Sequence, residues 1–181
     1  MIRLTQIDIG DVTARAELSE FLIAHEYPFH LVRRPDRETV EHWIEAGRYS
    51  GDENRPLWIE ADEARVGLVV LEDLVSNAPL FDLRLATEWR GVGLGSQVLR
   101  ALATYVFTSM PAVNRLEGQT REDNIAMRKS FIRSGFVKEG HYREAWPTEA
   151  GVPMASTAYG ILRRDWQTGR TTMFEWNDLT A

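Results

Sequence analysis

Residues 81–107, FDLRLATEWRGVGLGSQVLRALATYVF, change within one stretch from the pattern of a strand to that of a helix. Apolar and charged residues alternate over residues 81–85, as is typical of a half-buried strand. Further on, apolar side chains recur three or four residues apart, as on one face of an amphipathic helix: Leu94, Val98, Leu102, Tyr105 and Val106. We therefore expect a strand, a tight turn and a long helix.

Three glycines occupy the turn between this strand and this helix. The turn reads Arg90-Gly91-Val92-Gly93-Leu94-Gly95. Glycine lets the backbone approach a ligand closely, and the N–H groups of a helix's first turn favour an anion such as phosphate. The spacing fits neither a lysine-containing phosphate loop nor the dinucleotide fingerprint. Taken alone, the turn is also compatible with an ordinary surface turn beside an arginine.

The composition of the 181 residues, 44% hydrophobic and 27% charged, is that of an ordinary globular protein of one domain. The absence of cysteine excludes disulfides, thiolate zinc sites and a cysteine nucleophile. No signal-peptide core or membrane-spanning run is present, so we expect a cytoplasmic protein without a membrane partner. The net charge of −6 argues weakly against nucleic-acid binding and is compatible with a cationic small substrate.

The first part of the chain alternates strand and helix patterns. We expect a short strand over residues 2–7 and a helix capped by Asp11, whose apolar face holds Val12, Leu18, Phe21 and Leu22. A second helix follows Asp36 and ends at Gly47. Residues 56–60 and 65–74 then form two strands joined by a polar turn.

After the long helix, the pattern indicates a strand over residues 115–120 and a helix opened by Asp123 or Asn124 and closed by Gly135. The apolar contacts of that helix are expected from Ile125, Phe131 and Ile132. Residues 137–146 and 154–162 form a hairpin. Residues 165–181 show no period and are expected to be a tail that packs on the domain or on a partner.

This order of elements resembles the GNAT superfamily of acyl-CoA-dependent N-acyltransferases over residues 2–166. The glycine turn is similar to the family's pyrophosphate motif, and Asn124 with Gly135 and Phe136 is similar to its second CoA motif. Segments 139–143 and 159–166 look most like the RimJ/RimL branch, whose members acetylate protein N-termini, amino acids, polyamines or amino sugars.

The resemblance implies an α/β (α+β) fold, with a mixed and mostly antiparallel central sheet of about seven strands, about four flanking helices, and a splayed strand pair that holds CoA. It implies one acyltransferase domain over residues 1–166 with a C-terminal tail over residues 167–181. The implied activity is transfer of an acetyl group from the co-substrate acetyl-CoA to a primary amine by direct attack on the thioester.

In this resemblance, the glycine turn binds the CoA pyrophosphate and the Arg90 side chain adds charge. The pantetheine arm pairs like an extra strand with the edge of residues 83–86, and Asn124 hydrogen-bonds to it. Arg121, Arg128 and Lys129 are candidates for the adenosine phosphate, or are merely solvated. The predicted CoA-binding residues are Leu83, Leu85, Ala86, Arg90, Gly91, Val92, Gly93, Leu94, Gly95, Ser96, Asn124 and Arg128.

The amine arrives protonated at neutral pH, so a carboxylate must remove a proton directly or through water. Asp82, on the strand face opposite Leu83, is the first candidate for this base, and Glu72 and Glu117 are alternatives. Each of the three carboxylates is also compatible with a solvated or ion-paired strand residue.

The proton donor for the leaving thiolate stays open in the sequence. Phe131 and Met127 occupy the positions where the family often has a donor tyrosine or serine. Tyr142, Ser130 and His141 are substitutes, and a CoA thiolate also leaves without an acid. Ala155 replaces an aspartate common in the branch, which puts the usual acceptors in question.

Aromatic and histidine side chains in segment 25–30 either line the acceptor pocket or pack on the core: His25, Tyr27, Phe29 and His30. No carboxylate or cysteine completes a metal-ligand spacing, so no metal is expected. The competing functions are use of another acyl-CoA and a non-catalytic acyl-CoA-binding or regulatory domain. A homodimer would form through the last strand or through residues 171–176, where Met173 and Phe174 look exposed.

Overall fold

The computed structural model describes residues 1–174, in which seven strands, five α-helices and one short 3-10 helix follow one another. The elements of the first half are β1 (Ile2–Gln6), α1 (Val12–Ala24), α2 (Arg37–Glu45), β2 (Arg55–Ala61), β3 (Ala64–Glu72), β4 (Leu80–Leu85) and η1 (Thr87–Trp89). Those of the second half are α3 (Leu94–Ser109), β5 (Arg115–Arg121), α4 (Ile125–Arg133), β6 (Val137–Trp146), β7 (Met154–Leu162) and α5 (Arg163–Thr168).

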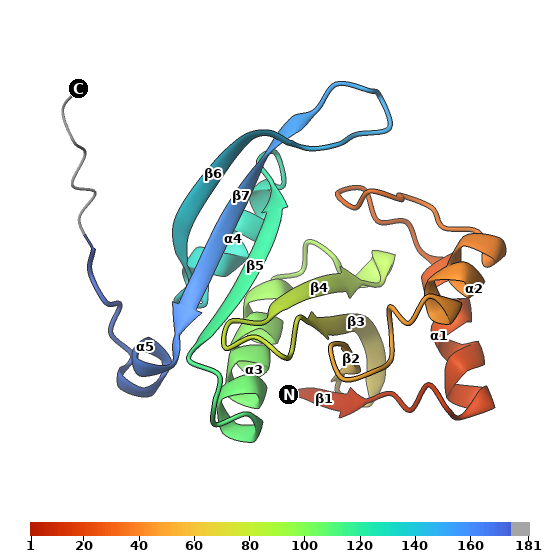
Figure 1. Cartoon of the computed structure of the whole chain (residues 1–181), viewed down its shortest axis with the longest axis horizontal. Coiled ribbons are helices and arrows are strands. Elements are labelled where there is room, and N and C mark those ends of the chain that lie inside the picture. Colours follow the sequence, from red (N-terminus) through yellow and green to blue (C-terminus); the bar gives the residue numbers. More distant parts are fainter. Residues whose placement is uncertain (175–181) are drawn as a thin grey trace.

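The strands form two antiparallel sheets that meet at one seam (Figure 1). The first sheet has the order β1-β2-β3-β4 and the second the order β5-β7-β6. At the seam, the Glu117 N–H donates to the Pro79 carbonyl at 3.0 Å, and the Asn114 N–H donates to the Asn77 carbonyl at 3.2 Å. Beyond these bonds β4 and β5 diverge, which confirms the splayed strand pair expected from the sequence.

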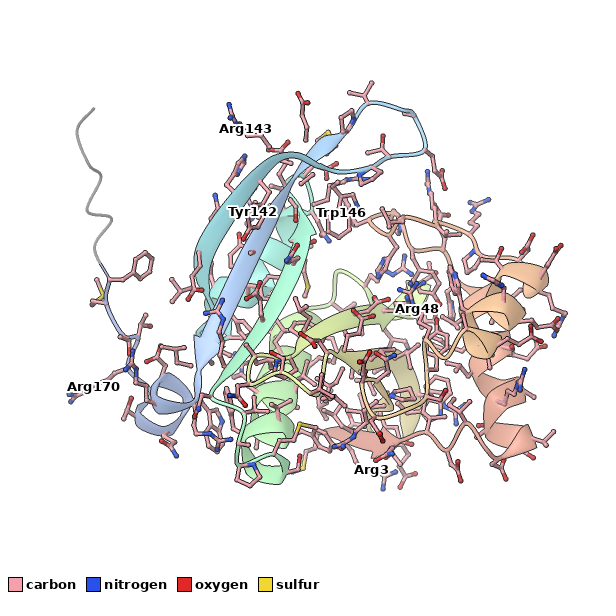
Figure 2. The ribbon with its side chains drawn as sticks, in the orientation of Figure 1. Arg3, Arg48, Tyr142, Arg143, Trp146 and Arg170 are labelled. Carbon is pink, nitrogen blue, oxygen red and sulfur yellow. The ribbon has the colours of Figure 1, made fainter. Side chains whose placement is uncertain are left out.

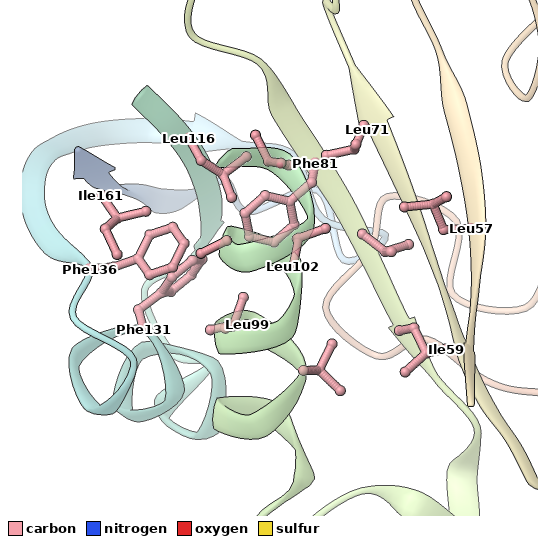
Figure 3. Close-up of a cluster of buried hydrophobic side chains, with 14 of the residues drawn as sticks. Leu57, Ile59, Leu71, Phe81, Leu99, Leu102, Leu116, Phe131, Phe136 and Ile161 are labelled. Carbon is pink, nitrogen blue, oxygen red and sulfur yellow. The ribbon is translucent and has the colours of Figure 1, made fainter. Parts of the chain in front are cut away.

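One hydrophobic core holds the two sheets together beneath the seam (Figure 3). Phe81 of β4 lies near Phe131 of α4, with ring centres 6.1 Å apart, and α3 contributes Leu99 and Leu102 to the same cluster. Gly118 of β5 is required there, because a Cβ at this position would lie 2.7 Å from both Phe81 and Phe131. The core beneath the seam is therefore tightly packed, and β4 and β5 separate only above it.

Helices α1 and α2 cover the face of the four-stranded sheet that lies opposite α3. Asp11 caps α1 by accepting from the Ala14 N–H at 2.8 Å, as expected. Buried side chains of α1 and α2 pack on β2 and β3: Leu18, Leu22, Val40 and Ile44 against Trp58, Leu68 and Val70. This layer brings the connecting loop, residues 25–36, close to the open end of the seam (Figure 1).

Three expected core contacts were wrong. Val12, at the first position of α1, is 82% exposed, and Ile125 and Ile132 of α4 are largely exposed as well. Helix α4 is short and lies on the surface, so only one side of it meets the core, and Phe131 occupies that side. Apolar side chains on its outer side remain in water.

The sequence showed no period from residue 165 onward, yet the structure has a short helix there, α5, which spans Arg163–Thr168. The Arg163 guanidinium donates to the carbonyls of Phe107, Met110 and Val113, and Trp166 packs on Phe107 with ring centres 5.6 Å apart. These contacts attach α5 to the end of α3 and to the loop that follows it. With six residues, α5 is too short to show a helical period in the sequence. Met173 and Phe174 are exposed as expected, whereas Trp176 of the expected dimer surface lies outside the described residues.

Candidate active site

A cavity of about 850 Å³ opens at the seam between the two sheets. One wall comes from the loop after α1, from α2 and from Arg48, and its base comes from β4 and the end of β3. The opposite wall comes from β5, the start of α4 and the β6–β7 hairpin, including Tyr142 and Trp146. Figure 2 shows Trp146 on the side of the three-stranded sheet and Arg48 on the side of the four-stranded sheet.

Asp82 lies at the base of this cavity and is held by two arginines and a histidine. Its carboxylate accepts hydrogen bonds from His30 Nε2 at 2.8 Å, Arg48 Nη2 at 3.0 Å and Arg84 Nη2 at 2.9 Å. Burial alone would raise the pKa of Asp82, but the charges of Arg84, His30 and Arg48 hold that pKa well below its usual range. A carboxylate held in this way is a weak proton acceptor, so the contacts favour the ion-paired interpretation of Asp82.

Glu72 lies on the same face of the sheet, since β3 pairs Val70 with Asp82 and Glu72 with Leu80. Burial raises the pKa of Glu72 and the negative charge of Asp82 raises it further, and these two effects outweigh the lowering by the charges of Arg48 and Arg84. Within residues 1–174 its carboxylate makes no hydrogen bond or close ion pair. Of the two predicted carboxylates that line the cavity, Glu72 therefore has the environment better suited to accept a proton.

The other two predicted catalytic residues lie in different surroundings. Glu117 on β5 pairs with Arg115 at 2.8 Å and does not line the cavity. Tyr142 on β6 lines the cavity and is about half exposed. Its ring covers Gly140, where a Cβ would lie 2.9 Å from the ring. The structure thus brings Asp82, Glu72 and Tyr142 to one cavity and leaves Glu117 outside it.

The glycines before α3 do two different things. Gly91 and Gly93 have positive φ angles of 75° and 83°, and no atom lies within 4 Å of the position that a Cβ would take at either residue. Gly93 is the N-cap of α3. Gly95 faces the protein instead, because a Cβ there would lie 2.7 Å from Ser130 Oγ of α4. The first two glycines leave an open surface at the helix N-terminus, and Gly95 permits close packing of α3 on α4.

Arg90 is fastened to the end of β4. Its Nε and Nη2 atoms donate to the Leu85 carbonyl at 2.9 and 2.8 Å, and its guanidinium lies 5.6 Å from the Tyr27 ring centre. These contacts fix the turn and keep a positive charge beside it. Direct contact of Arg90 with a phosphate stays a prediction.

The exposed edge of β4 can be assigned residue by residue. The Ala86 N–H donates to the Val66 carbonyl of β3, so this predicted CoA contact is already used within the sheet. Backbone groups of successive strand residues point to opposite edges. Those of Leu83 and Leu85 therefore face the seam, although Arg90 occupies the Leu85 carbonyl. Leu83 is left as the best-placed backbone partner for an added strand.

The predicted CoA contacts on α4 have local roles. Asn124 is the N-cap of α4: it accepts from the Met127 N–H at 3.2 Å and donates to Thr120 Oγ1 at 3.0 Å. Its amide carries a second N–H, and the residue lines the cavity. Arg128 donates to the Tyr159 hydroxyl and to the Glu122 carbonyl. With two of its nitrogens bound to protein, Arg128 has fewer donors left for an adenosine phosphate.

The aromatic segment after α1 is divided between core and cavity. Tyr27 is buried, and its hydroxyl donates to the Phe21 carbonyl at 3.1 Å. Phe29 and His30 line the cavity. The lining residues that were not predicted as site residues include Trp43, Arg48, Arg84 and Trp146. Only Arg84 gave a signal, since it alternates with Asp82 within the strand pattern.

The family follows from comparison with known proteins. A family model described as an acetyltransferase (GNAT) domain matches residues 2–137. The chain belongs to the GNAT acetyltransferase family. Membership confirms the expected fold, the acetyl-CoA co-substrate and the N-acetylation of an amine. A sequence comparison with curated proteins finds no match for this GNAT acetyltransferase.

Solved structures share the GNAT fold at low sequence identity. The spermidine N-acetyltransferase of Vibrio cholerae in complex with CoA and spermine is 19% identical, with a TM-score of 0.69 over 92% of this chain and 98% of that one. A probable acetyltransferase is 22% identical, with a TM-score of 0.67 over 91% of this chain and 93% of that one. At such identities the likeness shows the fold alone.

Among the helices of residues 1–174, none combines the length and apolar character needed to span a bilayer. Within the same residues, no three histidine, cysteine, aspartate or glutamate side chains lie together as a candidate metal site.

Proposed function

We propose that this GNAT acetyltransferase acetylates a small primary amine that binds in the cavity at the seam, with Glu72 as the general base. The observation that carries this proposal is the continuity of the cavity. It extends from Leu83 and Asn124, predicted to contact the donor, to Glu72 and the loop after α1. Donor and acceptor would therefore meet in one cavity, where positioning alone accelerates the reaction.

In the proposed donor complex, the CoA pyrophosphate binds the N-terminus of α3. The open surface at Gly91 and Gly93 and the exposed N–H groups of that turn support this placement. The pantetheine arm then runs along β4 and pairs with the backbone of Leu83. Asn124 approaches the arm from the other side of the seam.

In the proposed reaction, the neutral amine attacks the thioester carbonyl. The C–N bond forms, the C–S bond breaks, and CoA leaves as the thiolate. Glu72 accepts the proton that the amine loses, directly or through water. Tyr142 is the lining hydroxyl best able to return a proton to the thiolate, because Met127 carries no acidic proton and Phe131 is buried in the core.

The proposal extends to the branch of the family, the domain bounds, the location and the oligomeric state. Segments 139–143 and 159–166 support membership of the RimJ/RimL branch. We propose for this chain a single domain over residues 1–166 with a tail over residues 167–181. Helix α5 crosses that boundary, which attaches the start of the tail to the domain. We also propose a cytoplasmic protein that forms a homodimer through β7 or the tail.

The proposal is tested by a thiol-release assay with acetyl-CoA and a panel of primary amines, with the acetylated product identified by mass spectrometry. We expect release that depends on both substrates and yields an N-acetylated amine. Propionyl-CoA and succinyl-CoA test the other acyl donors. If acetyl-CoA binds but every amine is left unmodified, the chain is instead an acyl-CoA-binding domain.

A further inference from the structure

The cavity contains more positive charge than its one firmly ionised carboxylate can balance. Arg48 and Arg84 both contact Asp82, and His30 donates to its other oxygen. The Arg84 side chain is only 3% exposed, and its guanidinium lies 4.8 Å from the Tyr27 ring centre and 5.4 Å from that of Trp43. Two guanidinium groups thus share one carboxylate in a largely buried place.

Several residues that line this cavity carry a buried donor nitrogen without an acceptor. Among residues 1–174, Arg84 Nη1, Arg48 Nε and Trp146 Nε1 are buried without a hydrogen-bond partner. Each of these nitrogens can only donate. A buried donor without an acceptor is costly, so such groups in a cavity indicate the position of a ligand's acceptor atoms.

We infer that the acceptor amine also carries a carboxylate, which Arg48 and Arg84 bind beside Asp82. This inference rests on the proposed function, because it concerns the same cavity. A guanidinium group binds a carboxylate with two parallel hydrogen bonds, which suits the fixed arginines. The Trp146 N–H supplies a further donor from the opposite wall.

The remaining lining groups fit a zwitterionic acceptor. Glu72, at the end of β3, would receive the ammonium group, and the arginines would receive the carboxylate. Apolar side chains from the loop after α1 and from α2 leave room for a hydrocarbon portion: Phe29, Leu31, Val32 and Trp43. A polyamine would instead bring additional positive charge to Arg48 and Arg84, which like-charge repulsion disfavours.

Assays of the wild-type protein with pairs of amines that differ in one carboxylate test this inference. One pair is an apolar α-amino acid and its carboxamide, such as phenylalanine and phenylalaninamide. A second set of equal chain length is 4-aminobutyrate, butylamine and the diamine putrescine, with spermidine as a longer polycation. We expect kcat/KM to be at least about tenfold higher for a carboxylate-bearing amine than for its matched uncharged or cationic partner, about 1.4 kcal/mol in binding.

Variants of Arg48 then test whether this side chain causes the preference for carboxylate-bearing acceptors. Arg48→Met should raise KM for the carboxylate-bearing acceptor about tenfold or more and reduce its advantage over the matched amide, while KM for acetyl-CoA stays unchanged. Arg48→Lys should recover part of the affinity, because it keeps charge but loses the paired donors. Arg3→Met is the matched control, since Arg3 lies on β1 and pairs with Glu60, away from the cavity (Figure 2).

The outcomes separate this inference from the proposed function. Faster turnover of the amide, butylamine or polyamine members would overturn the inference and leave N-acetylation standing. If no amine is turned over, calorimetric binding of the same pairs to the CoA-loaded protein decides: tighter binding of the carboxylate member supports the inference, and equal or weaker binding overturns it. Failure of acetyl-CoA itself to bind would contradict the proposed function and the inference together.

Discussion

At the scale of single residues, two carboxylates on one face of the first sheet have opposite environments. Asp82 is held by Arg84, His30 and Arg48, which keep its pKa well below its usual range against the effect of burial. Burial and the charge of Asp82 raise the pKa of Glu72. Paired carboxylates whose pKa values are pushed apart typically divide the roles in an active site. We propose that Glu72 accepts the proton and that Asp82 holds Arg48, Arg84 and His30 in place.

The variant Glu72→Gln should lose activity and gain stability. We expect kcat/KM to fall by about a hundredfold or more, and the rise of kcat/KM with pH that reflects ionisation of Glu72 to disappear. Because the pKa of Glu72 is raised in the folded state, stability is lost as pH rises from the ordinary glutamate range through that pKa. Glu72→Gln should therefore raise Tm at neutral pH and have little effect in acid.

Asp82→Asn is the matched control and should have the opposite effect on stability. The folded-state pKa of Asp82 is lowered, so its contribution is present above the ordinary aspartate range and is lost as pH falls through the folded pKa. Asp82→Asn leaves the buried Arg84 without its carboxylate partner, which should lower the free energy of unfolding by about 3 kcal/mol at neutral pH. Urea unfolding at neutral and acid pH measures both variants. Equal pH–rate profiles for Glu72→Gln and the wild type would contradict the assignment of the base.

The sequence predicted Asp82 as a site residue and offered His30 as a pocket residue, but it did not predict that His30 and Arg48 contact Asp82. His30 and Arg48 are 52 and 34 residues distant from it, in irregular segments without a period. Their arrival depends on how α1 and α2 pack on the sheet, which no local pattern specifies. The burial of Arg84 was not predictable for the same reason. Its alternation with leucine indicates that the strand has two faces, but it does not show what covers each face.

At the scale of elements, the turn before α3 and the cap of α4 were predictable because each depends on local chemistry. The positive φ angles of Gly91 and Gly93 require residues without a Cβ, and Asn124 forms the cap that its residue type favours. Gly95 was predicted as part of the same motif, yet it also serves the contact between α3 and α4. Spacing alone does not separate a ligand contact from a packing contact.

Gly93→Ala tests the turn. The alanine meets no atom within 4 Å but must adopt φ of +83°, which costs about 1 kcal/mol, and its methyl group would project into the proposed pyrophosphate site. We expect Kd for acetyl-CoA, measured by calorimetry, to rise about tenfold or more. Gly51→Ala is the control, since Gly51 has φ of +86° and equally open surroundings in the loop before β2. Equal weakening by both variants would show that strain, and not the site, is responsible.

At the scale of the whole molecule, two sheets share one core and separate only above it. The hydrogen bonds from Asn114 and Glu117 close the seam at one end, and Phe81, Gly118 and Phe131 close it from beneath. This division was implied by the resemblance to the family, but periodicity alone would have indicated only seven strands. The open end admits an extended ligand between the sheets. A ligand bound there would contact both halves and stabilise the folded chain by mass action.

The most direct test is a calorimetric titration of the wild-type protein with acetyl-CoA. We expect saturable binding with one acetyl-CoA per chain and a rise of Tm at saturating ligand. Binding should be weakened in Gly93→Ala and unchanged in Arg3→Met, whose side chain lies on β1. Absence of binding at millimolar acetyl-CoA would contradict the placement of a CoA co-substrate in the seam between β4 and β5.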